Sequence, residues 1–457
     1  MSNASLDRGI QAIIPAYQPA SDETLAQYAV DGIIPQAVVS PENVEQVSEI
    51  IRLAGRMGLS VIPRGSGTKM GLGLPPSRAD IVLSLDRLNK VLEYEPADLT
   101  ATVQAGIRLT DLQTQLGEHG QFFPIDPPYG DACTLGGVIA TNASGLLRWT
   151  HGTARDLVIG TKVVQADGTV VKAGGKVVKN VAGYDMNKMY IGSLGTLGII
   201  VELTLKLQPR PEAGRAVLAR FPFITTAVDT AFKGLDSPIA PSFVEMANPV
   251  PVAILARRAG GGLGDAGFPL IIGAIGPSET VNWQIAEAEK LCHQAGAVQV
   301  VTMSPQLYRT AIDLIREFPT GQIVPQGMRA PGVVCRASVL PSDVGRLYQI
   351  AEDRSQKLGV GCAMLSHFGN GAVVFVFFQD QPFEGERLEI LVSIIRQLSA
   401  AATEFGGHLT VESAPLAVKQ RLDVWGARPS DWGLMRALKD RFDPSRVLSP
   451  GRFVGGL

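Results

Sequence analysis

Residues 63–71 read PRGSGTKMG, with three glycines in nine positions directly after the apolar run LSVI. Glycine lets successive backbone N–H groups converge on one side and leaves no Cβ to block an approaching anion. The preceding chain predicts a helix with Ser40 at the cap, Pro41 in the first turn and Gly58 at its end. LSVIP then predicts a short buried strand, so the glycines lie where a strand runs into a loop. Such a position suits a phosphate-binding loop, and a plain surface turn is the alternative.

The glycine spacing separates this loop from the Rossmann fingerprint. It reads G-x-G-x-x-x-G, which is one residue longer, and no helix pattern or acidic residue follows at the required distance. A Rossmann-type NAD fold is therefore disfavoured. An anion-binding nest of another kind is predicted, to which Ser66 and Thr68 can add hydroxyl donors.

Length and composition limit the class of protein. A chain of 457 residues is too long for one ordinary hydrophobic core, so two domains are expected. Charged residues make up 18% and the formal net charge is -2, so the basic excess of a nucleic-acid-binding protein is lacking. No apolar run reaches the length of a membrane span, and the N-terminus does not resemble a signal peptide. We therefore expect a cytoplasmic protein.

The four cysteines are Cys133, Cys292, Cys335 and Cys362, and they stand far apart. Because no CxxC pair occurs, neither an iron–sulfur cluster nor a structural zinc site has its usual ligand spacing. We expect all four to be small, buried, apolar residues. If this chain transfers electrons, a group other than an iron–sulfur cluster must therefore carry them.

Two further segments rich in small residues follow in the same half of the chain. They are TLGGVIATNASG, residues 134–145, and GSLGTLGII, residues 192–200, and in both the backbone is predicted to approach something closely. Between them Asp167 and Gly168 predict the turn of a β-hairpin. Three separate glycine-rich segments thus belong to one half of the chain that mixes α and β structure.

In this order the three segments resemble the FAD-binding oxidoreductases of the vanillyl-alcohol oxidase type, also called the PCMH type. PRGSGTKMG looks like the pyrophosphate loop of that family, TLGGVIATNASG like its second flavin-contacting segment, and GSLGTLGII like the stretch whose backbone meets the nucleotide. Within the family, the chain looks most like the FAD-binding subunits of glycolate oxidase. The segments that carry this closer resemblance are KVVKNVAGYDMNKMYIGSLGTLGII, ESAPLAVKQRLDVWG and DRFDPSRVLSPGR.

The resemblance implies an α+β fold, in which a PCMH-type FAD-binding domain of two subdomains carries an antiparallel-sheet α+β cap domain for the substrate. The expected ranges are 1–212 for the FAD-binding domain, 213–424 for the cap, and 425–457 for a C-terminal segment that returns to the FAD-binding domain. Strands of the cap are predicted at AVLARFPF, APSFVEMA, PLIIGAIG, GVVCRASVL and GAVVFVFFQ. The run LMRALKDRFDP predicts a terminal helix whose charged face is solvated.

The matching positions imply contacts with FAD in all three segments. The expected contact residues are Pro63, Arg64, Gly65, Ser66, Gly67, Thr68, Pro127, Thr134, Gly136, Gly137, Asn142, Gly145, Gly198 and Ile199. Relatives with covalent flavin attach it through a histidine in the first loop, where this chain has Thr68, Lys69 and Met70, so non-covalent FAD is expected. Ser449 departs from the asparagine that many relatives carry before Pro-Gly.

A flavoprotein that oxidises a 2-hydroxy acid needs a cation for the carboxylate and a base or metal for the hydroxyl proton. Arg336 matches an arginine that binds the substrate carboxylate in related dehydrogenases, and a guanidinium suits this task. The alternative is an arginine exposed on a surface strand. His367 is the second candidate for a catalytic residue, and a hydrogen-bonded structural histidine is its alternative.

The metal-binding pattern of the catalytic relatives is incomplete in this chain. Where they carry H-x-G-D-G-N-x-H, the sequence SHFGNG keeps His367 but lacks the Asp and the second His. Their G-E-H-G segment appears here as VESAP, which leaves Glu412 without its histidine. Catalytic divalent metals usually take about three protein ligands. No bound metal is therefore expected.

Two functions fit these observations, and the incomplete metal pattern favours the first. In it the chain is an FAD-bearing subunit of a glycolate dehydrogenase-type complex, with a paralogous flavin subunit and an iron–sulfur subunit as partners. In the second it is a stand-alone FAD-dependent D-2-hydroxy acid dehydrogenase, with Arg336 orienting glycolate, D-lactate or a similar acid. The intact loops argue against a third reading, a flavin-shaped scaffold with no redox role. No nucleic acid and no direct membrane span are expected, and any membrane association would be made through partners.

Overall fold

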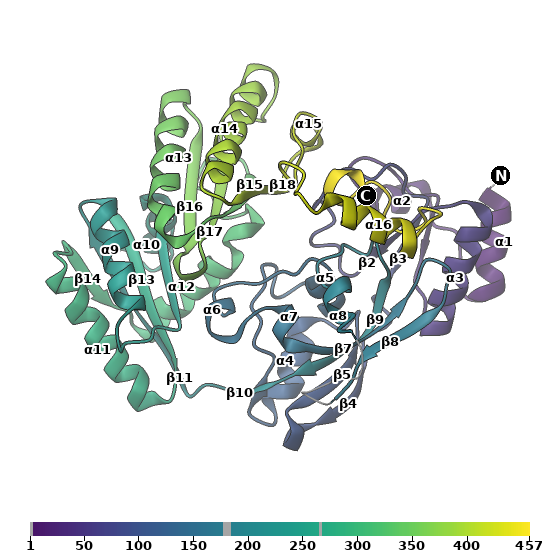
Figure 1. The fold of residues 1–457 in the computed structure, drawn as a ribbon, viewed down its shortest axis with the longest axis horizontal. Helices are drawn as coiled ribbons and strands as arrows, with labels where there is room; N and C mark the ends of the chain where they lie inside the picture. The colour runs from purple at the N-terminus through teal and green to yellow at the C-terminus, as the bar shows by residue number, and fades with distance from the viewer. Residues whose placement is uncertain (1–2, 177–183, 265–266) are drawn as a thin grey trace. The chain divides into compact units, whose positions relative to one another are not determined.

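The computed structural model describes residues 3–176, 184–264 and 267–457. The chain forms two compact units (Figure 1). Unit 1 comprises Met1–Ser144, His151–Arg210 and Ala427–Leu457, and unit 2 comprises Gly145–Thr150 and Pro211–Gly426. The short segment Gly145–Thr150 thus belongs to unit 2, although the residues on both sides of it belong to unit 1. Residues 177–183, which contribute to the closer resemblance, lie outside the described residues.

The first sheet of unit 1 is parallel and has the strand order β1-β3-β2. Its strands are β1 (Ala37–Val39), β3 (Ile81–Ser84) and β2 (Val61–Arg64). Helix α3 (Val44–Met57) buries its apolar stripe in the core that these strands share, and α1 (Asn3–Ile13) packs against α3. β2 is the strand predicted at LSVIP, and it leads directly into the first glycine-rich segment.

The two ends of α3 differ in how well local sequence predicts them. Gly58 ends the helix in the left-handed region, with φ 65°, as predicted. The cap predicted at Ser40 is wrong, because Asn43 is the N-cap and its side chain accepts a hydrogen bond from the backbone N–H of Gln46. A short polar side chain that reaches the first turn decides the start, and Ser40 lies too far upstream to do so.

The second sheet of unit 1 is antiparallel, with the order β4-β5-β9-β7-β8. Its strands are β4 (Val91–Glu95), β5 (Thr100–Gln104), β9 (Ile199–Lys206), β7 (Val158–Val164) and β8 (Val170–Gly174). Helices α4 (Leu109–Gly117) and α5 (Leu135–Ala140) share a core with it. The predicted hairpin is confirmed, since β7 and β8 pair across a turn in which Gly168 has φ 80°. Unit 1 thus contains one parallel and one antiparallel sheet.

Shorter elements complete unit 1. The helices are α2 (Asp22–Gln27), α6 (Arg148–His151), which begins in unit 2, α7 (Ala154–Leu157), α8 (Asn187–Tyr190) and α16 (Trp432–Phe442). The strands β6 (Gln121–Phe122) and β10 (Gln208–Pro209) pair with each other.

Unit 2 is built on an eight-stranded antiparallel sheet with the order β14-β11-β13-β12-β16-β17-β15-β18. In chain order the strands are β11 (Ala213–Phe221), β12 (Phe243–Ala247), β13 (Phe268–Gly276), β14 (Gln299–Thr302), β15 (Val333–Ser338), β16 (Gly361–His367), β17 (Ala372–Phe378) and β18 (His408–Ser413). The five strands predicted for this region, β11, β12, β13, β15 and β17, are confirmed. β16, which carries His367, is a strand that the sequence reading did not predict.

Helices cover the sheet of unit 2, and this explains its continuous apolar runs. They are α9 (Ile224–Leu235), α10 (Pro249–Arg258), α11 (Ser278–Gln294), α12 (Pro305–Glu317), α13 (Val344–Leu358), α14 (Gly385–Glu404) and α15 (Leu416–Lys419). Figure 1 shows α9, α11, α13 and α14 running beside the strands, while residues of α10 and α12 share a core with β16 and β17. Every residue of β17 is buried, as is typical of a strand between two helical layers. The fold is α+β, as expected.

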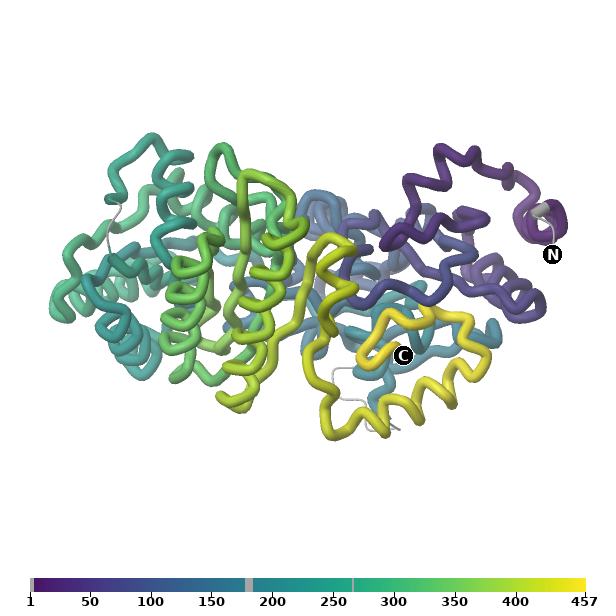
Figure 2. Tube along the Cα trace, turned by 90° about the horizontal axis from the view of Figure 1, so that it is seen from above, coloured from purple at the N-terminus to yellow at the C-terminus, as the bar shows by residue number. Residues whose placement is uncertain are grey.

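The C-terminal segment returns to unit 1 and lies beside β2. The backbone N–H of Val61 donates to Val447 at 2.7 Å, and Ser449 donates to the carbonyl of Val61 at 3.0 Å. Figure 2 shows this yellow segment alongside the purple and blue N-terminal part of the chain. The prediction of a solvated charged face on the terminal helix is wrong at one position, because the side chain of Lys439 in α16 is only 1% exposed. A partner later in the chain turns this lysine inward.

Candidate functional site

The three glycine-rich segments meet at one cavity within unit 1. Its empty volume, which includes space open to solvent, is about 830 Å³. The predicted contact residues that line it are Pro63, Arg64, Gly65, Ser66, Gly67, Thr68, Pro127, Thr134, Gly136, Gly137, Gly198 and Ile199. Asn142 and Gly145 lie outside the lining that the described residues form, although the neighbours of Asn142, Thr141 and Ala143, are part of it.

Glycine is required where the first two segments approach each other. A Cβ added at Gly65 would lie 1.8 Å from Oγ1 of Thr134, so no larger residue fits between the loop and the residue that precedes α5. Gly67 has φ 85°, and a Cβ there would lie 2.4 Å from Nε of Arg64. Gly136 lies against Ala105, where an added Cβ would approach its Cβ to 2.7 Å. The glycines thus shape a cavity wall of exposed backbone, as a bound pyrophosphate requires.

Polar atoms beside the cavity also suit an anionic dinucleotide. The guanidinium of Arg64 stacks over the ring of Tyr28 at 4.2 Å, and its Nε is buried with no hydrogen-bond partner among the described residues. Asn142 adopts a left-handed φ of 48°, and its Oδ1 is likewise buried without a partner in the described part of the chain. A cation and a backbone cradle are the groups that a diphosphate needs, so these residues fit the expected FAD.

The sequence reading missed several residues that line the cavity. Among them are Leu85, Cys133, Leu194, Gly195 and Arg452. Arg452 comes from the C-terminal segment and donates from Nη2 to the carbonyls of Met70 and Leu72, at 2.5 and 2.6 Å. Burial lowers the pKa of Arg452 to about 10. The available signal was DRFDPSRVLSPGR, a segment that carries the resemblance and whose last arginine is this residue.

Ser449, where many relatives carry asparagine, also belongs to this C-terminal segment. It is fully buried and adopts a left-handed φ of 44°. Its Oγ has no hydrogen-bond partner among the described residues. Asparagine tolerates this backbone region better than serine, so the position carries some strain here.

His367 in unit 2 is buried and paired with an acid that the sequence reading missed. Its Nδ1 lies 2.9 and 2.8 Å from the two carboxylate oxygens of Glu245, and the residues are direct partners across β12 and β16. Burial raises the pKa of Glu245, and the nearby His367 opposes this shift. No sequence motif around PSFVEMA marked this glutamate.

Arg336 is mostly buried, so the alternative of an arginine exposed on a surface strand is wrong. Its side chain is 19% exposed, and its Nε donates to Oε1 of Glu412 at 2.6 Å. Glu412 is the acid that the resemblance placed in a broken metal pattern, and here its carboxylate is engaged by Arg336. Within the described residues, no group of three or more His, Cys, Asp or Glu side chains is placed to hold a metal ion.

Strand register places Arg336 and His367 on the same face of the unit 2 sheet. Arg336 and Leu365 are both partners of Val374 on the intervening strand β17. Directly paired residues point to the same face, and so do residues two apart on one strand, which brings His367 to the face of Leu365. With β17 between them, β15 and β16 are about 10 Å apart.

Family comparisons agree with this architecture. Residues 35–174 match the family described as FAD binding domain, and residues 210–453 match the C-terminal domain of the FAD linked oxidases. The chain belongs to the FAD-linked oxidase family. FAD is therefore the cofactor of this FAD-linked oxidase, and the cavity of unit 1 has the residues to hold it.

Known proteins resemble this FAD-linked oxidase over most of its length. Glycolate oxidase subunit GlcD of Bacillus subtilis (strain 168) is 30% identical over 92% of this chain and 89% of the relative. A D-lactate dehydrogenase of Archaeoglobus fulgidus is 28% identical over 97% of this chain and 98% of the relative. The structure of p-cresol methylhydroxylase with substrate bound has the same fold, with a TM-score of 0.78, 18% identity, and coverage of 98% of this chain and 96% of that one. In the described residues, no helix is both long and apolar enough to cross a bilayer.

Proposed function

We propose that this FAD-linked oxidase takes part in the oxidation of a small 2-hydroxy acid, such as glycolate or D-lactate, to the 2-oxo acid. One observation carries the proposal, namely similarity over more than nine-tenths of the chain to relatives named for such acids. They are glycolate oxidase subunit GlcD, a D-lactate dehydrogenase, and a D-2-hydroxyglutarate dehydrogenase that is 29% identical over 92% of this chain. All three named acids carry a hydroxyl group on the carbon next to a carboxylate.

The two units take different tasks in this proposal. Unit 1 holds FAD in the cavity lined by the three glycine-rich segments, and bound FAD supplies a hydride acceptor. The segment Pro211–Gly426 of unit 2 is the substrate domain, because it carries both candidate residues on one face of its sheet. This assignment corresponds to the cap that the resemblance implied.

Arg336 and His367 have complementary chemistry for a 2-hydroxy acid. The terminal nitrogens of Arg336 can hold a carboxylate while its Nε stays on Glu412. With Nδ1 of His367 turned to Glu245, Nε2 is the ring nitrogen left to accept a proton from the substrate hydroxyl. Glu245 fixes the orientation of the ring in this arrangement.

We further propose that the chain works as one part of a complex, with a paralogous flavin protein and an iron–sulfur protein as its partners. The ion pair between Arg336 and Glu412 supports this choice, because the Glu412 carboxylate neutralises the positive charge that would attract a substrate carboxylate. The stand-alone dehydrogenase is the second candidate, and the buried pair of His367 and Glu245 favours it, since that pair resembles an oriented base.

An anaerobic titration of the purified, FAD-loaded chain separates the candidates. Glycolate and then D-lactate are added while the visible absorption of oxidised flavin is followed. A stand-alone enzyme bleaches with at least one acid, and Arg336→Met should then raise the concentration needed. A chain that depends on partners stays oxidised alone and bleaches after proteins that purify with it are added. If neither preparation bleaches with either acid, the proposal of 2-hydroxy acid oxidation is wrong.

A further inference from the structure

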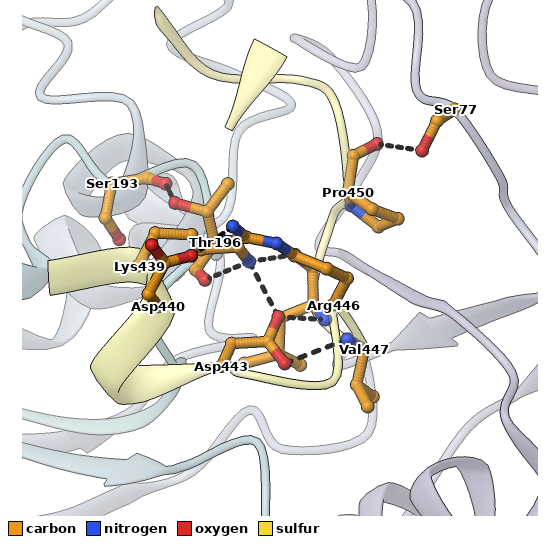
Figure 3. Close-up of polar contacts among 10 residues, drawn as sticks. Ser77, Ser193, Thr196, Lys439, Asp440, Asp443, Arg446, Val447 and Pro450 are labelled. Carbon is orange, nitrogen blue, oxygen red and sulfur yellow. Dashed lines mark hydrogen bonds and ion pairs between the residues drawn. The ribbon is translucent and has the colours of Figure 1, made fainter. Parts of the chain in front are cut away.

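Lys439 is a buried cation in unit 1 that no motif singled out. Its side chain is 1% exposed, and its ammonium group donates to Oδ2 of Asp443 at 2.6 Å. It also donates to the carbonyl of Thr196 at 2.8 Å (Figure 3). A third bond, also of 2.8 Å, goes to the carbonyl of Leu448. An ammonium group has three N–H donors, so every donor of Lys439 has an acceptor.

Asp443 completes the charge balance of this cluster. Its carboxylate is fully buried, and it accepts from the backbone N–H groups of Val447 at 2.9 Å and Leu448 at 2.8 Å. A buried ion pair costs desolvation energy, so such a pair is weak evidence for stability alone. The ion pair does fix the position of each group that is hydrogen-bonded to it. Here those groups are backbone carbonyls and amides.

The Thr196 carbonyl belongs to the third glycine-rich segment. Gly195 and Gly198 on either side of it line the FAD cavity. Leu194 and Gly195 have left-handed φ values of 53° and 70°, so this backbone is irregular. Thr196 is further held by its own Oγ1, which donates to the carbonyl of Ser193 at 2.7 Å. Lys439 thus binds the irregular part of the third glycine-rich segment, just before β9 begins at Ile199.

The Leu448 carbonyl belongs to the C-terminal segment that flanks the first glycine-rich segment. Leu448 forms a parallel bridge with Val61, two residues before Pro63 of the cavity lining. Farther along, Ser77 donates from its backbone N–H to Pro450 at 2.9 Å, and its hydroxyl also contacts that carbonyl (Figure 3). Arg452 then reaches Met70 inside the loop region. The C-terminal segment is therefore tied to the first loop along its length.

We propose that Lys439 is a positioning residue for FAD. Its single ammonium group holds the Thr196 carbonyl and the Asp443–Arg452 segment together, and this fixes the spacing between the first and third glycine-rich segments across which FAD binds. The inference rests on the FAD cavity and not on the identity of the substrate. Burial lowers the pKa of Lys439, and the Asp443 carboxylate opposes that shift, which helps to keep the ammonium charged.

The test replaces Lys439 with Met, which has a similar length but no charge and no donor. FAD is removed from each purified protein, and its dissociation constant on rebinding is measured by fluorescence at a temperature where the apoprotein is folded by circular dichroism. Arg436→Met is the matched control, since Arg436 lies on the same helix with its side chain 60% exposed. We expect Lys439→Met to weaken FAD binding about tenfold or more, because the two segments lose the contact that fixes their spacing, and the control to leave it unchanged.

A second measurement separates positioning from general stability. At saturating FAD, the visible circular dichroism of bound flavin should differ between Lys439→Met and the parent protein, while Arg436→Met should match the parent. A dissociation constant within about twofold of the parent, or an unchanged flavin spectrum, overturns the proposal.

Should Lys439→Met fail to fold, Asp443→Asn takes its place, because it removes the carboxylate charge that holds the Lys439 ammonium between the two carbonyls. An intermediate loss of affinity then supports the proposal, and parental affinity refutes it. Because FAD binding is measured without substrate, failure here is distinct from failure of the proposed oxidation.

Discussion

Glu245 and His367 face each other across β12 and β16, with Nδ1 of the imidazole 2.9 and 2.8 Å from the two carboxylate oxygens. The glutamate is 1% exposed and the histidine 6% exposed. A carboxylate excluded from water needs such a partner, since an unpaired buried charge is costly. The contact therefore fixes the orientation of the imidazole whether or not His367 acts as a base.

Glu245→Gln should flatten part of the pH dependence of stability. Burial raises the pKa of Glu245 above its ordinary value of 4.5, so the folded chain binds this proton more tightly than the unfolded chain. The resulting stabilisation is fully present below pH 4.5 and is lost as the pH rises through the folded pKa. Denaturant titrations of both proteins at a series of pH values test this. The parent should lose stability relative to the variant as pH rises, and parallel profiles would contradict the assignment.

Arg336 and Glu412 should be energetically coupled. Their side chains are 19% and 15% exposed, so Arg336→Met leaves a partly buried carboxylate without its cation. We expect Arg336→Met and Glu412→Gln each to cost about 1–3 kcal/mol of unfolding free energy. The double variant should cost less than the sum of the two. Urea unfolding measures all three, with Arg309→Met on the exposed surface of α12 as a near-neutral control. Strict additivity would show that the pair is not coupled.

Gly67→Val should give a protein that purifies without flavin. Gly67 has φ 85°, which a β-branched residue strongly disfavours, and an added Cβ would meet the guanidinium of Arg64 at 2.4 Å. Gly71→Ala is the matched control in the same loop, because a Cβ there meets nothing within 4 Å. Flavin content per chain, from the visible spectrum, is the measurement. Full flavin occupancy in Gly67→Val would refute the cofactor role of this loop.

The cysteines should be unreactive in the folded protein. All four are buried, and burial raises the pKa of Cys292 and Cys362 to about 12. The thiolate is the reactive form, so its fraction near neutral pH is very small for these two residues. A colorimetric thiol reagent should label almost no thiol in native protein and all four in denaturant. Rapid labelling of native protein would show that one of the thiols is accessible.

The local sequence was sufficient to predict those elements that depend on local backbone geometry. The three glycine-rich segments, the Asp167–Gly168 hairpin and the end of α3 at Gly58 follow from glycine conformation and hydrophobic periodicity, which act over a few residues. The start of α3 was misplaced, because a side chain at Asn43 that bonds the Gln46 backbone decided it. The strand β16 was not predicted, although all but its first residue are buried.

The sequence by itself determined the α+β class, the three glycine-rich segments and the family to which the chain belongs, since these rest on local patterns and their order. Tertiary structure alone decided the pairs that complete each site. His367 and Glu245 are 122 residues apart, and Lys439 and Thr196 are 243 apart. Whether a charged side chain is solvated depends on which distant segment packs against it. A local sequence pattern does not identify that segment. For this reason Lys439 looked like a surface residue and is instead buried between the C-terminal segment and the third glycine-rich segment.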